Sequence, residues 1–250
     1  MPSAPGPMEV FSCRPLGETI IGFTMKTLLP LLLVAAASAS AQSAAVKAPA
    51  DQYSFSVDKY EIVRDGDDFD GMAFGAKARV ADNLRIAFSY ADASSDAFAL
   101  VSGLNLELDA SRFSLGAEYD IPAGPGAITL SLGYAQTSAE AEGGATGDAF
   151  NNRQFVLGAR YGMSLGAGFT AAVAVNHFVS DFEAEGGFST APARAALVNR
   201  YDGSPTSVGL TLAYTPTDLV TIHLTYATQD SLLGLAGADN TISFGVRANF

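Results

Sequence analysis

The sequence predicts an all-β fold, a transmembrane antiparallel up-and-down β-barrel of about ten strands. Two observations carry this prediction: apolar and polar residues alternate with a period of two over successive segments, and the connections between these segments alternate in length. Period-two alternation places one set of side chains on each face of a strand. Beyond the N-terminal region, no apolar run reaches the about 20 residues that a transmembrane helix needs. Any membrane crossing is therefore expected to use strands.

The clearest strand is the final segment, 240–250. Its apolar set is Ile242, Phe244, Val246, Ala248 and Phe250, and its small or polar set is Ser243, Gly245, Arg247 and Asn249. In a membrane barrel the outer set meets lipid and the inner set meets a polar lumen. We expect this segment to close the barrel.

Nine earlier segments alternate in the same way and suit tilted strands of about 9–11 residues. They are 53–63, 71–80, 84–93, 110–121, 127–138, 152–163, 169–182, 205–215 and 219–230. In the first, Lys59 and Tyr60 interrupt the pattern, which predicts a bulge or an early exit from lipid. The stretch 98–108 can extend the third and fourth strands beyond the membrane.

The connections alternate between short turns and long loops. The short turns are expected to centre on Asn83, Gly124, Gly166 and Thr217, and the long loops are 64–70, 92–108, 139–151, 183–204 and 231–239. Outer-membrane barrels place their short turns in the periplasm and their longer loops outside the cell. An even number of strands brings both ends of the barrel to the periplasm.

The N-terminal region reads as a targeting segment. Residues 25–41 combine Lys26, an apolar run and the small residues Ala39-Ser40-Ala41, which is typical of a signal peptide. We expect residues 1–24 to be an upstream stretch with a mis-called start, 42–50 a periplasmic lead-in, and 51–250 the barrel. Cys13 is the only cysteine, so no intrachain disulfide can form.

Charge excludes one class of function and leaves another open. The net charge of −12 argues against nucleic-acid binding, which needs a basic face. Four carboxylates lie in the loop 65–71, but they do not fit a calcium-binding loop, so we expect a solvated acidic loop without metal or cofactor. Divalent cations could bridge the acidic loops to anionic lipopolysaccharide.

The signal peptide and three further motifs carry a resemblance to a known family. The hairpin ends Leu115–Tyr119 and Leu157–Tyr161 and the terminal stretch 244–250 resemble those of small porin-family barrels of the Gram-negative outer membrane, akin to the OmpA-type barrel domain. The resemblance covers about residues 50–250. It implies a monomer in outer-membrane lipid, with Phe250 read as an assembly signal by the barrel-assembly machinery.

The function predicted is a structural or surface-interaction barrel with a filled lumen, and a small diffusion pore is the alternative. A soluble sandwich or lipocalin-like barrel fits less well, because one face of the strands carries small residues with charge, which cannot pack a core.

An outer-membrane enzyme is a further alternative, either an omptin-like protease or a lipid A-modifying enzyme. Such sites would use His177 with Asp181, or a histidine two residues from a serine. His177 and Ser180 are three apart, which places them on opposite faces of a strand. We therefore expect no enzyme, with His177 at the membrane boundary and His223 in the lumen.

The inward parity of each strand predicts an ionic cluster in the lumen. Its members are Lys77, Arg79, Arg85, Arg112, Glu118, Asp120, Arg160 and Arg247. We expect them to plug the periplasmic end, with a wetter vestibule of small residues in the outer half and any leak favouring anions. Tyr119, Tyr161 and Tyr214, together with Phe250, are expected to form an aromatic girdle at the same end.

Overall fold

The computed structural model describes residues 52–250, apart from 65, 144–145 and 190–191. The expected upstream stretch, signal peptide and lead-in lie outside the described residues, as does Cys13. Within the described part of the chain, no helix has the length and apolar character needed to cross a membrane.

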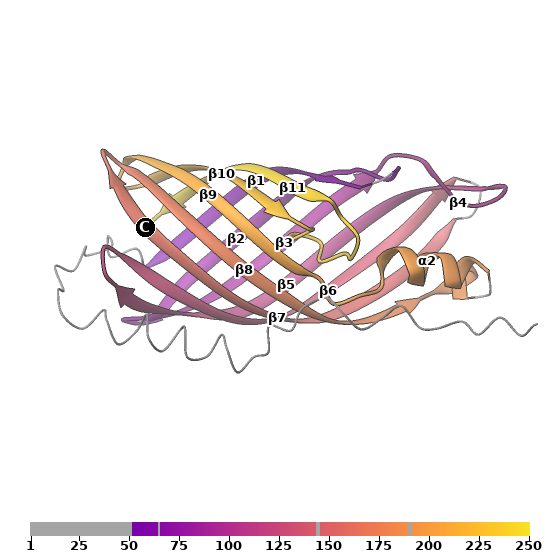
Figure 1. Ribbon diagram of the computed structural model, residues 1–250, viewed down its shortest axis with the longest axis horizontal. Coiled ribbons are helices and arrows are strands. Elements are labelled where there is room, and N and C mark those ends of the chain that lie inside the picture. The colour runs from indigo at the N-terminus through magenta and orange to yellow at the C-terminus, as the bar shows by residue number, and fades with distance from the viewer. Residues whose placement is uncertain (1–51, 65, 144–145, 190–191) are drawn as a thin grey trace, which may run out of the picture. The chain divides into compact units, whose positions relative to one another are not determined.

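Ten antiparallel strands form a closed ring (Figure 1). The strands are β1 (Tyr53–Val63), β2 (Phe69–Ala81), β3 (Leu84–Ser95), β5 (Leu104–Ala123), β6 (Gly126–Gly143), β7 (Gly147–Gly166), β8 (Phe169–Ala184), β9 (Thr206–Thr217), β10 (Val220–Thr228) and β11 (Asn240–Asn249). Each pairs with its neighbours along the chain, β3 pairs directly with β5, and β11 pairs with β1 to complete the ring. The predicted barrel and its count of ten strands are confirmed.

Three further elements lie at the end of the barrel that carries the long loops. The short strand β4 (Phe98–Val101) pairs with β5 beside the ring. The 3-10 helix η2 (Gly186–Ser189) and the helix α2 (Ala193–Tyr201) lie in the connection between β8 and β9. Figure 1 shows β4 and α2 together at this end and the C-terminus at the opposite one. We call these the long-loop end and the short-turn end.

The strands depart from the expected boundaries mainly at the long-loop end. β5 and β7 are 20 residues long, because the 98–108 stretch and the start of β7 continue the sheet beyond the expected membrane level. The bulge considered at Lys59 is absent, since β1 keeps an unbroken register with β11 from Ser54 to Val63. Instead, the outward face of β1 turns polar at Lys59 while Tyr60 points inward.

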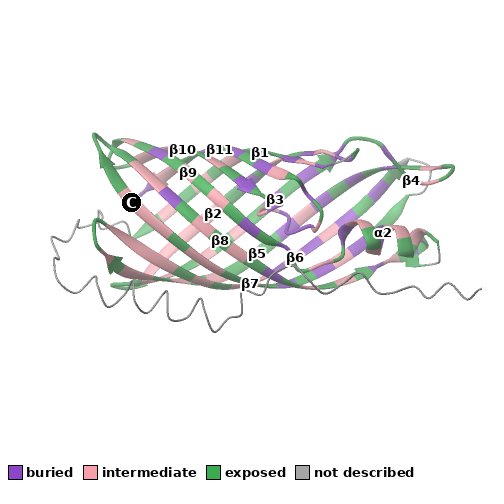
Figure 2. Ribbon diagram, viewed as in Figure 1, coloured by how far each residue is buried: buried purple, intermediate pink, exposed green. Residues whose placement is uncertain are grey.

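The polarity of the two barrel faces reverses along the strands. Near the short-turn end of β5, Leu115 and Tyr119 are exposed on the outer face, and the inward side chains are polar. Near the long-loop end, the inward Leu106 and Leu108 are fully buried, and the outward residues are acidic. Figure 2 shows that buried residues gather mainly in the half with β4 and α2. The barrel thus combines a lipid-facing section with a polar interior and a section with an apolar core.

Candidate functional site: the closed lumen

The lumen has three levels, which together form the candidate site. An ionic cluster lies at the short-turn end, a polar chamber lies above it, and the loop 229–239 between β10 and β11 folds inward above the chamber. We call this last segment the inner loop. The inward-facing positions of the strands supply the first two levels, so the alternation of the sequence positions their side chains directly.

The ionic cluster ties four neighbouring strands together. Lys77 Nζ on β2 donates to Glu118 Oε1 on β5 at 2.6 Å. Arg85 on β3 lies between two carboxylates, with Nη2 donating to Asp120 Oδ1 at 2.8 Å and Nε 3.3 Å from Glu118 Oε2. Thr129 Oγ1 on β6 also donates to Asp120, at 2.6 Å. Both carboxylates are therefore engaged by partners within the cluster.

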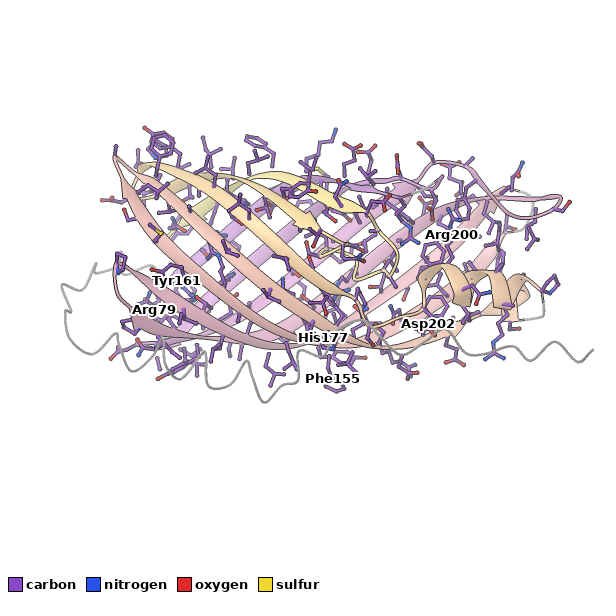
Figure 3. All side chains as sticks on the ribbon, in the orientation of Figure 1. Arg79, Phe155, Tyr161, His177, Arg200 and Asp202 are labelled. Carbon is purple, nitrogen blue, oxygen red and sulfur yellow. The ribbon has the colours of Figure 1, made fainter. Side chains whose placement is uncertain are left out.

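The other predicted members lie differently. Arg79, Arg160 and Arg247 face inward near the same end, but among the described residues they make no ion pair within 4.0 Å. Figure 3 places Arg79 toward the end that holds the C-terminus. Arg112 does not join the cluster. It pairs in register with Ala91 and Thr137, several residues closer to the long-loop end, and it contacts the inner loop.

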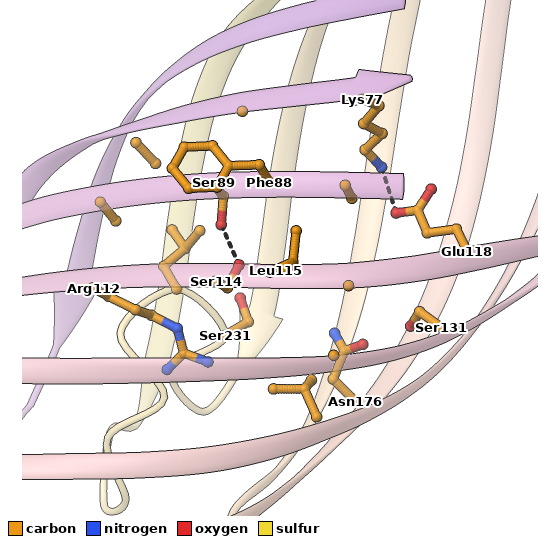
Figure 4. Close-up of a pocket in the computed structure, with 18 of the residues that line it drawn as sticks. Lys77, Phe88, Ser89, Arg112, Ser114, Leu115, Glu118, Ser131, Asn176 and Ser231 are labelled. Atoms are coloured by element: carbon orange, nitrogen blue, oxygen red, sulfur yellow. Dashed lines mark hydrogen bonds and ion pairs between the residues drawn. The ribbon is translucent and has the colours of Figure 1, made fainter. Parts of the chain in front are cut away.

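A chamber of about 340 Å³ lies between the ionic cluster and the inner loop (Figure 4). The side chains that face it are mainly small, polar or charged and include Ser56, Ser114, Ser131 and Asn176, while Phe178 adds an apolar surface. Ser89 and Ser114 hydrogen-bond to each other at 2.6 Å across β3 and β5. Lys77 and Glu118 line its lower side, and Arg112 and Ser231 line the side toward the inner loop. The chamber is polar without a concentrated charge of either sign.

The inner loop is held in the lumen by its backbone. Arg112 Nη1 donates to the Leu233 carbonyl at 2.5 Å, and Thr137 Oγ1 donates to the same oxygen at 2.6 Å. Gln154 Nε2 donates to the Gly234 carbonyl at 2.6 Å. Three strands of the wall, β5, β6 and β7, thus bind a loop that arises between β10 and β11.

Asp230 folds the inner loop into its shape. Its carboxylate is fully buried and accepts the backbone N–H groups of Leu232, Leu233 and Leu235 at 2.7, 2.9 and 2.8 Å. Burial raises the pKa of Asp230, and these three donors together with Arg112 oppose that rise. Leu233 and Leu235 are then turned into the apolar core, where both are fully buried.

Gly234 fits this loop for two independent reasons. Its φ of +71° is a left-handed conformation that favours glycine. A Cβ at this position would lie 2.1 Å from Arg112 Nη1 and 2.2 Å from Gln154 Oε1, the two side chains that hold the loop. No other residue type can occupy this position without moving the anchor.

An apolar core fills the lumen at the long-loop end. Tyr60, Ile62, Phe69, Leu106, Leu108, Phe150, Phe188, Leu197, Tyr201, Leu233 and Leu235 are among its members. They come from the inner wall, from η2 and α2, and from the inner loop. The prediction of a wetter vestibule in the outer half of the lumen is therefore wrong. The physical reason is that the long loops fold inward and carry apolar side chains, which remove this region from water.

A buried ionic hub joins the long loops above this core. Asp67 lies in the loop between β1 and β2 and is fully buried. Its Oδ1 is 2.6 Å from Arg200 Nη2 and 3.3 Å from Arg64 Nε. Its Oδ2 accepts a hydrogen bond from the Tyr201 hydroxyl, with 2.5 Å between the oxygens. Arg64 also donates to the carbonyls of Arg200, at 2.8 Å, and of Ala236. Burial raises the pKa of Tyr201. The hub therefore joins three loops: Asp67 binds the β8–β9 connection through Arg200 and Tyr201, and Arg64 binds the inner loop through the Ala236 carbonyl.

This hub corrects the expectation of a solvated acidic loop, because Asp67 is buried and satisfied. Asp65 lies outside the described residues. Across the described part of the chain, no group of three or more His, Cys, Asp or Glu side chains is placed to hold a metal ion.

Sequence reasoning missed the hub and the inner loop. Two clues were available. The run Leu232–Leu235 is apolar within a predicted loop, and Arg64 and Arg200 are basic residues in loops that carry several carboxylates. Both are typical of a loop that is buried rather than solvated.

The two histidines occupy different faces of the barrel. His223 points into the lumen, where its Nε2–H donates to Asp58 Oδ1 at 2.5 Å and its Nδ1 is buried with no partner among the described residues. Gly245 leaves room for this pair, since a Cβ there would lie 2.1 Å from Asp58 Oδ1. His177 is exposed and contacts Thr206 Oγ1 at 2.9 Å. Asp181 has the same outward parity as His177.

The predicted aromatic girdle lies on the outer surface near the short-turn end. Tyr119 and Tyr214 are exposed, Tyr161 is half-buried, and Phe250 is 63% exposed. Figure 3 places Tyr161 on the same side of the barrel as the C-terminus. Phe250 contacts Phe55 edge to face at 6.3 Å, and its backbone pairs with Tyr53.

Comparison with solved structures finds several distantly similar proteins. The chain is 15% identical to the translocator domain of autotransporter NalP from Neisseria meningitidis, covering 90% of this chain and 95% of that one with a TM-score of 0.39. It is 12% identical to the outer membrane protease OmpT from Escherichia coli, covering 80% and 94% with a TM-score of 0.38. The N-terminal β-barrel domain of OprF from Pseudomonas aeruginosa is 17% identical, with coverage of 80% and 99% and a TM-score of 0.32.

Comparison with curated protein sequences finds no match. At the level of families, residues 27–215 match the outer membrane protein beta-barrel domain. This match spans most of the chain and agrees with the closed ring of antiparallel strands and with the apolar outer surface. The protein therefore belongs to the outer membrane protein beta-barrel domain family and is a bacterial outer-membrane β-barrel.

Proposed function

We propose that this barrel is a non-conducting structural protein of the outer membrane, which presents its closed long-loop end at the cell surface. We assign the short-turn end to the periplasm, in line with other outer-membrane barrels. The observation that supports the proposal best is the inner loop, which is bound by side chains of β5, β6 and β7 and lies across the lumen.

The energetics of the closure support a permanent rather than a transient plug. The carbonyls of Leu233 and Gly234 accept three side-chain hydrogen bonds in a buried setting, and one of these comes from a charged donor. Hydrogen bonds to charged groups contribute about 1.5–3 kcal/mol each, and neutral ones about 1 kcal/mol. Leu233 and Leu235 add the burial of two apolar side chains, at about 1.5–3 kcal/mol each.

The wider setting of this proposal is a monomer in outer-membrane lipid, placed there by the barrel-assembly machinery after removal of a signal peptide. The acidic outer surface at the long-loop end would face lipopolysaccharide. We propose no catalysis, because His177 lies on the outer face of the barrel, away from the lumen.

Conductance across a planar bilayer tests the proposal. We expect no steady current from the purified wild-type barrel. A variant in which residues 231–237 are replaced by a short Gly-Ser linker should conduct, because the chamber would then be continuous with the outer side. A steady wild-type current as large as that of this variant would instead establish the alternative, a small diffusion pore.

A further inference from the structure

The short-turn end of the lumen carries an excess of positive charge. Five basic side chains face this end of the lumen: Lys77, Arg79, Arg85, Arg160 and Arg247. Only two carboxylates, Glu118 and Asp120, face the same end. The difference leaves three positive charges without compensation. The two carboxylates are already engaged by Lys77 and Arg85. The charges of Arg79, Arg160 and Arg247 therefore have no counter-ion among the described residues.

These arginines converge although their strands are far apart in the ring. Arg160 lies on β7 and Arg247 on β11, with β8, β9 and β10 between them. Arg160 lies within electrostatic reach of Arg247 and Arg85, which repel it, and of Glu118 and Asp120, which attract it; the repulsion by Arg247 is the strongest of these four interactions. Arg79 pairs in register with Arg85, and its Nε is enclosed without a hydrogen-bond partner. The side chains thus approach one another across the interior.

Like charges held close together in a confined space are costly, and an anion between them would remove that cost. Guanidinium groups suit oxyanions in particular, because their N–H donors form a planar fork that matches two oxygens at once. Arg160 is exposed to solvent, so water and small solutes have access to it. The inner loop lies on the far side of the chamber, so a solute would enter and leave by the short-turn end.

We propose that the short-turn end of the lumen is a binding site for a small oxyanion of the phosphate class, with Arg160 and Arg247 as its main ligands and Arg79 beside them. The site goes beyond a purely structural role, because it gives the barrel a periplasm-facing ligand that it binds without transporting. Whether the barrel conducts and whether this site binds phosphate are separate measurements, so either proposal can fail alone.

The test measures thermal unfolding of the purified, folded barrel in detergent as inorganic phosphate is added, with sodium chloride at matched ionic strength as the reference. Isothermal titration calorimetry on the same samples gives the dissociation constant. The variants are Arg160→Gln, Arg247→Gln and the double variant. Arg153→Gln is the matched control, since Arg153 faces outward on the same strand as Arg160. Heat-modifiability on gels checks that each variant folds.

We expect a saturable rise in the unfolding temperature with phosphate but not with chloride. In each single variant, the dissociation constant for phosphate should be at least tenfold larger than in the wild type. Arg153→Gln should bind as the wild type does. Without phosphate, Arg247→Gln should unfold at the same or a higher temperature, because it removes repulsion. Equal effects of phosphate and chloride, or wild-type affinity in the double variant, would overturn the proposal.

Discussion

At the scale of single residues, Asp67 shows how one carboxylate can organise several loops. It is fully buried, yet it lies in a stretch of acidic residues at the long-loop end. Arg64 in the same loop and Arg200 on α2 compensate its charge, and the Tyr201 hydroxyl donates a hydrogen bond to it. Breaking a buried ion pair from one side leaves the remaining charge without compensation, which is strongly destabilising.

Replacing Asp67 by Asn should therefore lower the free energy of unfolding by about 3–5 kcal/mol, because Arg64 stays buried without its counter-ion. The matched control is Asp70→Asn, in which the carboxylate is exposed and a change within about 0.5 kcal/mol is expected. Urea unfolding measures both, and limited proteolysis of the β8–β9 connection reports local release. Equal stabilities of the two variants would show that the hub contributes nothing.

A second prediction at this scale concerns the substitution of Gly234. Gly234→Ala combines a strained backbone with a collision against Arg112 and Gln154. Gly103→Ala isolates the backbone part, since Gly103 has a φ of +83° but nothing within 4 Å of the added Cβ. We expect about 1–2 kcal/mol of destabilisation for Gly103→Ala. For Gly234→Ala we expect a larger loss together with a measurable conductance, which Gly103→Ala should not produce.

At the scale of elements, a single strand serves two different environments. β5 presents Leu106 and Leu108 to an apolar core and Ser114 to a polar chamber, all on the same face. The change takes place near Arg112, which is bound to the inner loop. A strand of 20 residues can therefore cross the membrane and continue as the wall of a water-soluble section.

This change of environment predicts losses of stability of very different size within one strand. Leu108→Ala should cost about 2–5 kcal/mol, because it removes buried methyl groups and leaves a cavity. Ser114→Ala should cost about 1 kcal/mol or less, since it loses one hydrogen bond to Ser89 next to a water-accessible chamber. Thermal unfolding of both variants measures the difference. Similar losses would contradict an apolar core at the long-loop end.

The strands were predictable from the sequence, whereas the apolar core was not. Period-two alternation located all ten strands, because side chains that face lipid must be apolar whatever the loops do. The core was missed because Tyr60, Leu106 and Leu108 gain their environment from distant segments. Arg112 was assigned to the lumen by its parity, but its depth along the strand depends on the neighbours with which it pairs.

At the scale of the whole molecule, the ring is completed by the pairing of β1 with β11. Phe250 lies at this junction and contacts Phe55. Deleting Phe250 should lower the heat-modifiable, folded fraction in cells, because the assembly machinery would recognise the barrel less well. Phe55→Ala is the control. It removes the same ring contact, which contributes about 0.5–1.5 kcal/mol to stability, and it should leave the folded fraction largely unchanged. Equal membrane levels of the deletion and the wild type would contradict a role for Phe250 in assembly.

The position of the inner loop has a consequence for the order of assembly. The loop connects β10 with β11, the two strands that follow all its anchors along the chain. Arg112 also donates to Thr137 and Gln154, so these anchors can form across β5, β6 and β7 in a growing sheet before the last hairpin arrives. Closure of the ring and occlusion of its interior then become one event, so an incomplete barrel is open and only a finished one is shut.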